Sequence, residues 1–182
     1  MFKSNLDFKP ILENKSLVSD SNLEIIENIF TEEEQREILV AEIDTHYIDG
    51  VSLCNHYHVP YECGANCLVV ECKRGANKKY VALVVPVGYK YNMSSTVRKY
   101  TNSRMVSVAP LEYVLDETKM EQDSINPFGI PIELEIFVDP KVLDSEKIVC
   151  GSGLRKSKLM LPSKYLLKLP NVVILDNLAK EG

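Results

Sequence analysis

An uninterrupted apolar run at residues 81–85 is the feature that most constrains the fold of this 182-residue chain. Its residues do not alternate between apolar and polar, so both faces of such a strand must be covered by other parts of the protein. A second apolar stretch at residues 68–70 precedes it, and the connection between them contains Gly75 and Asn77. This arrangement predicts a β-hairpin whose second strand lies at the centre of a sheet.

Short strands and short helices alternate along the rest of the chain. Further strands are predicted at residues 105–108, 134–138, 147–150, 158–161 and 172–175. Helices are predicted at residues 44–57, 92–100, 110–119 and 162–169, two of which begin at a proline, a residue suited to the first helical turn. The pattern indicates a mixed α/β domain with a curved, largely antiparallel sheet surrounded by short helices.

Charge divides the chain into two parts. Residues 1–50 carry 4 basic and 12 acidic side chains, whereas residues 51–182 carry 17 and 14. Residues 1–22 are polar without a sustained period and predict an extended arm, and residues 25–38 predict short acidic helices. We therefore expect an N-terminal segment at residues 1–38 and one domain at residues 39–182, of which residues 51–182 are mildly basic and compatible with nucleic acid.

The N-terminus has charges where a signal peptide needs an apolar run, and the longest apolar stretch, residues 81–87, is too short to cross a bilayer. The five cysteines form no secretory pattern and are expected to be reduced thiols. These features predict a soluble cytoplasmic protein with no membrane partner.

Two loops have the composition of a rigid site. In residues 125–131, Pro127 and Pro131 fix φ on either side of Phe128 and Gly129, which predicts a stiff loop. In the second loop a strand leads into Gly151-Ser152-Gly153, whose backbone N–H groups could approach an oxyanion closely. From composition alone, a tight turn between two strands explains the second loop better than a binding site does.

Basic side chains follow this second loop. They are Arg155, Lys156, Lys158, Lys164 and Lys168. Such residues make phosphate contacts with RNA, although lysines on a solvated helix and strand are just as common.

Read together with residues 64–70 (Gly-Ala-Asn-Cys-Leu-Val-Val), the two loops resemble the YbaK/prolyl-tRNA-synthetase-associated domain family of aminoacyl-tRNA editing proteins. The resemblance covers roughly residues 40–176. It implies that family's fold and a freestanding protein that supports translation fidelity by hydrolysing the ester of a mischarged tRNA carrying a small amino acid. It also implies the tRNA acceptor end as partner, with an aminoacyl-tRNA synthetase as a second candidate, and neither cofactor nor DNA.

The resemblance implies site residues as well. Asn66, Gly151, Ser152 and Gly153 would surround the ester, and Pro127, Phe128, Gly129, Arg155, Lys156 and Lys158 would bind the rest of the substrate. The family has a lysine just before the strand at residues 68–70, whereas this chain has Asn66. An amide can donate to an ester carbonyl, but charge-assisted donors are about twice as strong. A protein that binds the aminoacylated end without efficient hydrolysis is therefore the alternative, and Asn66 could also simply bond local backbone.

Other chemistries fit the sequence less well. Ser152 has no histidine near it in sequence and no Gly-x-Ser-x-Gly pattern, which disfavours a serine nucleophile. His46, His56 and His58 lie close to four cysteines, but no Cys-x-x-Cys pair occurs, so no metal is expected. A third alternative is an interaction protein that docks through its acidic N-terminal helices.

Overall fold

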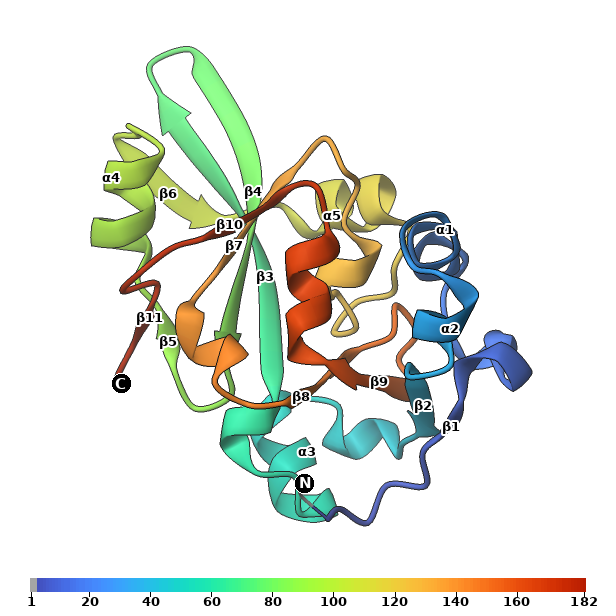
Figure 1. The fold of residues 1–182 in the computed structure, drawn as a ribbon. Coiled ribbons are helices and arrows are strands. Elements are labelled where there is room, and N and C mark those ends of the chain that lie inside the picture. The colour runs from blue at the N-terminus through green and yellow to red at the C-terminus, as the bar shows by residue number, and fades with distance from the viewer. Residues whose placement is uncertain (1–2) are drawn as a thin grey trace.

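A five-stranded mixed sheet forms the centre of the protein (Figure 1), which a computed structural model describes over residues 3–182. Its strands, in spatial order, are β10 (Val172–Ile174), β7 (Glu135–Val138), β4 (Asn77–Pro86), β3 (Ala65–Arg74) and β6 (Met105–Val108). The β10–β7 and β7–β4 pairs are parallel, and the β4–β3 and β3–β6 pairs are antiparallel.

The apolar run at residues 81–85 occupies β4 in the middle of this sheet, and each of its residues is 1% exposed or less. Ala82 and Val84 belong to the main core cluster, while Val81, Leu83 and Val85 belong to a second cluster on the opposite face. The prediction of a central strand covered on both faces is confirmed. The hairpin is longer than the sequence pattern indicated, because β3 and β4 pair over their full lengths.

A second, antiparallel sheet contributes to the same main core. Its strands, in spatial order, are β1 (Lys9–Pro10), β2 (Leu39–Glu42), β9 (Ser157–Pro162) and β8 (Lys147–Gly151). A two-stranded sheet pairs β5 (Lys90–Tyr91) with β11 (Ala179–Lys180). The mixed α/β class is confirmed, but the strands form separate sheets rather than one curved sheet. The reason is that β9 pairs with β2, a strand more than 100 residues earlier, which local patterns do not reveal.

The α-helices and the π-helix are short, and several begin at a side-chain cap. They are α1 (Asp20–Ile29), α2 (Glu32–Gln35), α3 (Gly50–Tyr57), the π-helix η5 (Met93–Val97), α4 (Arg98–Tyr100) and α5 (Leu111–Thr118). The 3₁₀ helices are η1 (Ile11–Glu13), η2 (Lys15–Leu17), η3 (Thr45–Tyr47), η4 (Tyr61–Cys63), η6 (Pro127–Gly129), η7 (Pro140–Leu143) and η8 (Ser163–Lys168). The helix predicted at residues 44–57 is thus divided into η3 and α3, each with its own aspartate cap.

From Ile11 onward, the N-terminal segment is not the extended arm predicted for residues 1–22. Ile11, Val18, Ile26, Phe30 and Ile38 are each 3% exposed or less and lie in core clusters with strands of both large sheets. Residues 11–38 therefore form a packed layer over the core. Among the described residues, no helix has both the length and the apolar composition needed to cross a membrane.

Candidate active site

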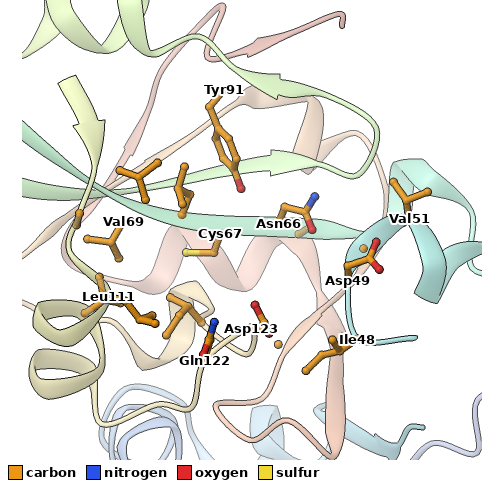
Figure 2. A pocket seen from close by; sticks show the side chains of 18 of the residues that line it. Ile48, Asp49, Val51, Asn66, Cys67, Val69, Tyr91, Leu111, Gln122 and Asp123 are labelled. Atoms are coloured by element: carbon orange, nitrogen blue, oxygen red, sulfur yellow. The ribbon is translucent and has the colours of Figure 1, made fainter. Parts of the chain in front are cut away.

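A cavity of about 440 Å³ opens beside β3, at the point where β6 stops pairing with it (Figure 2). Five segments line it: the first half of β3, the start of α3, the junction of β6 with α5, the loop at residues 122–125, and the facing ends of β8 and β9. Tyr91 from β5 also contributes. The cavity therefore joins parts of the chain that are far apart in sequence.

The edge of β3 supplies main-chain groups to this cavity. The pairing of β3 with β6 covers only Val70 to Lys73, and the N–H of Ala109 adds one bond to the carbonyl of Val69 at 3.0 Å. In an antiparallel strand every second residue directs its N–H and C=O to the same side, so Cys67 directs both groups to the side of Val69. Because β6 ends before reaching Cys67, these groups face the cavity.

Lys158 brings a cation into the cavity from the opposite sheet. It lies in β9 opposite Gly151, it is 7% exposed, and its side chain lines the cavity. Among residues 3–182, no acceptor lies within hydrogen-bonding or ion-pairing distance of its ammonium. No side-chain nitrogen in this part of the chain is both sealed from solvent and without a partner, so the ammonium is open to the cavity.

Burial lowers the pKa of Lys158, because removal from water disfavours the charged form. The nearby Cys150, Asp123, Asp49 and Cys54 act in the opposite direction. The effect of burial on the pKa of Lys158 therefore outweighs the effect of these neighbours. None of them forms an ion pair with the ammonium.

Asn66 lines the same cavity from β3 and packs against the first residue of α3. A β-carbon added to Gly50 would lie 2.6 Å from the Asn66 Oδ1 atom, so this close approach requires glycine. The side chain of Asn66 makes no hydrogen bond within the described residues. The alternative in which it bonds local backbone is therefore wrong, and its amide is available to a ligand.

Two carboxylates flank the opening, and Figure 2 shows them around one hollow with Asn66. Asp49 caps α3: it accepts from the hydroxyl and backbone N–H of Ser52, and these bonds lower the pKa of its carboxyl. Asp123 accepts from Arg155 Nη1 at 2.7 Å. The mouth of the cavity therefore combines negative charge at its rim with the positive charge of Lys158.

Neither the thiols nor the tyrosine of this region is activated for nucleophilic attack. Burial raises the pKa of Cys67 far above its usual range and raises the pKa of Cys150 to about 12. Both thiols stay protonated at neutral pH and so lack the nucleophilic thiolate. Burial also raises the pKa of Tyr91, whose hydroxyl remains a neutral donor.

The Gly-Ser-Gly loop borders the cavity only through Gly151. The Gly153 N–H donates to the carbonyl of Ser124 at 3.1 Å, and the completely buried Ser152 hydroxyl lies 2.7 Å from the Ser157 hydroxyl. A β-carbon on Gly153 would lie 2.1 Å from Ser19 Oγ, at a residue with φ of +84°. Ser152 and Gly153 therefore hold the loop in place, and these groups are not free for a substrate.

Residues 127–129 lie outside the cavity. Phe128 is fully buried, with its ring 6.3 Å from that of Phe30, and Gly129 is close to Met120 and Asn22. The proline-flanked loop is therefore part of the core under α1. The expected convergence of all three loops on one cleft is found only for the Asn66 and Gly151 segments.

The basic residues after the loop also separate. Arg155 is occupied by Asp123, Lys156 is exposed, and Lys158 is turned into the cavity. These three side chains do not form one phosphate-binding edge, because Arg155 is paired with Asp123 and Lys158 is buried, which leaves only Lys156 free at the surface.

A family model described as "Aminoacyl-tRNA editing domain" matches residues 49–169, about two thirds of the chain, which include every residue that lines the cavity except Ile48. The chain belongs to this editing-domain family. No curated protein matches it.

The fold is shared with solved structures of low sequence identity. A proposed trans-editing enzyme for prolyl tRNA synthetase superimposes with a TM-score of 0.71 at 16% identity, over 91% of this chain and 99% of that one. A scaffold used for computational epitope grafting superimposes with a TM-score of 0.72 at 15% identity, over 91% of this chain and 100% of the scaffold. A structure of a hypothetical protein superimposes with a TM-score of 0.72 at 16% identity, over 88% of this chain and 100% of that protein. At these identities the likeness establishes the architecture alone.

Sequence reasoning missed the position of Lys158 and the roles of Asp49, Cys67 and Gly50. A signal for Lys158 exists in β9, where Leu159 and Leu161 mark the core-facing side, so Lys158 shares the other face with Met160. That face is covered only because α3 packs over it, and no local pattern shows this.

Proposed function

We propose that this protein is an editing deacylase that hydrolyses the ester between a small amino acid and the terminal ribose of a mischarged tRNA. The observation that carries the proposal is the unpartnered ammonium of Lys158, a residue that is only 7% exposed, in a cavity shared with the free amide of Asn66. An ester carbonyl gains negative charge when water attacks it, and fixed donors in a site shielded from water stabilise that charge strongly.

In the proposed reaction, water adds to the ester carbonyl carbon and gives a tetrahedral oxyanion. The oxyanion collapses, the bond from the acyl carbon to the ribose oxygen breaks, and the ribose oxygen takes the proton released by the attacking water. The products are the free amino acid and a tRNA with a free hydroxyl. Lys158 and Asn66 would donate to the carbonyl oxygen, and Asp49 or Asp123 would accept from the α-ammonium of the aminoacyl group.

The walls of the cavity favour a small side chain. They include Val69, Leu111, Val114 and Ile125, and the volume of about 440 Å³ is near the lower end of ligand pockets. Once a ribose is bound there, little room is left for a large amino acid. An upper size limit of this kind is how editing sites reject cognate substrates that are too bulky.

A panel of tRNAs mischarged with alanine, serine, cysteine or proline tests the proposal. We expect at least one ester to be hydrolysed well above its spontaneous rate, and a phenylalanyl or tyrosyl ester to be spared. If no ester in the panel is hydrolysed while acylated tRNA still binds, the protein is instead a binding module for the aminoacylated end.

Replacing Asn66 with alanine should lower the deacylation rate by roughly threefold to tenfold, because a neutral hydrogen bond contributes about 1 kcal/mol. The measurement is kcat/KM on the best ester of the panel. Asn28→Ala, at an exposed position of α1 far from these groups in sequence, is the matched control and should leave the rate unchanged. If Asn66→Ala hydrolyses the ester at the native rate, the Asn66 amide has no role in the reaction.

A further inference from the structure

Positive charge is concentrated in one part of this otherwise acidic chain. Residues 71–104 contain eight lysines and arginines but a single acidic residue, Glu71, while the whole chain has a net charge of −5. The rest of the chain is correspondingly acidic. This local excess is much sharper than the mild basic character of residues 51–182 as a whole.

Seven of these eight side chains gather at the end of the β3–β4 hairpin and on the segment beside it. They are Lys73, Arg74, Lys78, Lys79, Arg98, Lys99 and Arg104. The hairpin projects beyond the rest of the molecule at the top of Figure 1, with α4 and β6 next to it. The Arg104 N–H donates to the Lys73 carbonyl at 2.8 Å, so the segment at residues 98–104 is attached to the hairpin.

Most of this charge is not neutralised within the protein. The carboxylate of Glu71 has one oxygen 2.9 Å from Lys73 Nζ and the other 3.9 Å from Lys78 Nζ. Glu135 Oε1 lies 3.3 Å from Lys79 Nζ. Arg74, Arg98, Lys99 and Arg104 have no ion-pair partner among the described residues. Arginine and lysine side chains held apart from carboxylates are suited to contact phosphate.

The hairpin end also contains a shallow hollow of about 230 Å³. It is lined by Arg74, Lys78 and Lys79 together with polar side chains, among them Asn77 and Ser103. Cations accompanied by amide and hydroxyl donors are the groups that bind phosphate and ribose oxygens. The turn itself carries Gly75 and Ala76 rather than large apolar residues, which disfavours insertion into a membrane.

The distance between hairpin and cavity matches the reach of a nucleic-acid strand. From Val69, at the cavity, to Gly75, at the turn, β3 spans about 20 Å at roughly 3.3 Å per residue. Met105 and Val108 of β6 lie along this path and are 61% and 60% exposed. An unpaired base could rest on Val108, which lines the cavity, while the backbone runs toward the cations.

We propose that the hairpin end, with residues 98–104, binds the phosphate backbone of the RNA whose terminal nucleotide enters the cavity. This surface replaces the edge at Arg155 and Lys156 as the main electrostatic contact. The proposal rests on the proposed function for the identity of the RNA, but it concerns binding and not hydrolysis.

The test measures binding of uncharged tRNA, and of an RNA stem-loop with a single-stranded 3′ end, at several salt concentrations. The test variant is Arg74→Gln/Lys99→Gln/Arg104→Gln, which breaks no ion pair. The matched control is Lys156→Gln/Lys164→Gln/Lys180→Gln, which removes the same charge elsewhere and also has no ion pairs to lose among the described residues. Melting temperatures verify that both variants are folded.

We expect the hairpin variant to bind roughly tenfold to a hundredfold more weakly, and its salt dependence to decrease by about two to three counterions. The control variant should stay within about twofold of the native protein. Native-like binding by the hairpin variant, or an equal loss in both variants, would overturn the proposal. Deacylation measured separately shows whether the proposed function fails, because that reaction can be absent while RNA binding follows the expected pattern.

Discussion

Replacing Lys158 with methionine is expected to lower kcat/KM for deacylation by about a hundredfold. The ammonium is the only cation of the described residues that lines the cavity, and one well-placed donor to a developing oxyanion contributes about 3 kcal/mol. Methionine keeps a similar length and an apolar stem, so the cavity walls should persist. The measurement is single-turnover hydrolysis of the best mischarged tRNA of the panel.

The same replacement should leave the protein at least as stable as before. An unpaired ammonium on a side chain that is only 7% exposed is poorly hydrated and destabilises the folded state, and methionine removes that cost. We expect an increase in melting temperature of a few degrees, since 1 kcal/mol corresponds to about 2–4 °C for a chain of this size. A variant that lost activity through misfolding would instead melt at a lower temperature, so the two explanations are separable.

The pH dependence follows from the lowered pKa of Lys158. Between that pKa and the ordinary lysine value of about 10.4, the unfolded chain holds a proton that the folded protein has released. Stability therefore rises with pH in this window, while activity falls as the ammonium is lost. Both trends should be absent in Lys158→Met.

A relocated lysine provides the control. In Asn66→Lys/Lys158→Met the cation moves from β9 to β3, and part of the lost rate should return. If Lys158→Met hydrolyses the ester as fast as the native protein, with the same pH profile, this ammonium has no role in the reaction.

The parts of the fold that the sequence predicted well are those governed by local patterns. The hairpin at residues 65–86 follows from two apolar strands joined by a short glycine turn, and α5 follows from Pro110 and the apolar spacing after it. The division of the strands into separate sheets depends on which distant strands pair, and nothing in residues 39–42 or 157–162 encodes that locally.

The residues of the candidate site also fall into those that the sequence identified and those whose surroundings depend on distant packing. Gly151 was identified from its loop and Asn66 from the family resemblance, and both line the cavity. Phe128 and Gly153 have the same kind of local sequence, yet they are buried under the N-terminal layer. Whether a glycine loop faces a ligand or the core depends on what packs over it. That requires the position of residues 19–22, which contact this loop from the other end of the chain.

Deleting residues 1–38 is expected to unfold the protein rather than to remove a dispensable arm. The segment buries the side chains of Ile11, Val18, Ile26, Phe30 and Ile38. Burying one such side chain stabilises a protein by about 1.5–3 kcal/mol, so the five together contribute roughly 8–15 kcal/mol. That range equals the whole stability of an ordinary domain, about 5–15 kcal/mol.

Polar contacts between the segment and the rest of the chain add to this loss. The Asn22 Nδ2 donates to Asn126 Oδ1 at 2.8 Å and the Asn126 Nδ2 donates back to Asn22 Oδ1 at 3.1 Å, both fully buried. Deletion would leave the Asn126 amide without this partner, at a further cost of about 1–3 kcal/mol.

Urea denaturation followed by circular dichroism measures the effect, and we expect no cooperative transition in the truncated chain. The full-length variant Glu24→Gln/Glu33→Gln is the control, because it removes exposed acidic charge from the segment without touching buried groups. If the truncated chain unfolds cooperatively with near-native stability, the N-terminal segment is an appendage, and its acidic charge is then the feature to test for a docking role. If only the truncation unfolds the protein, the segment belongs to the editing domain and supports the loop at Gly151 from beneath.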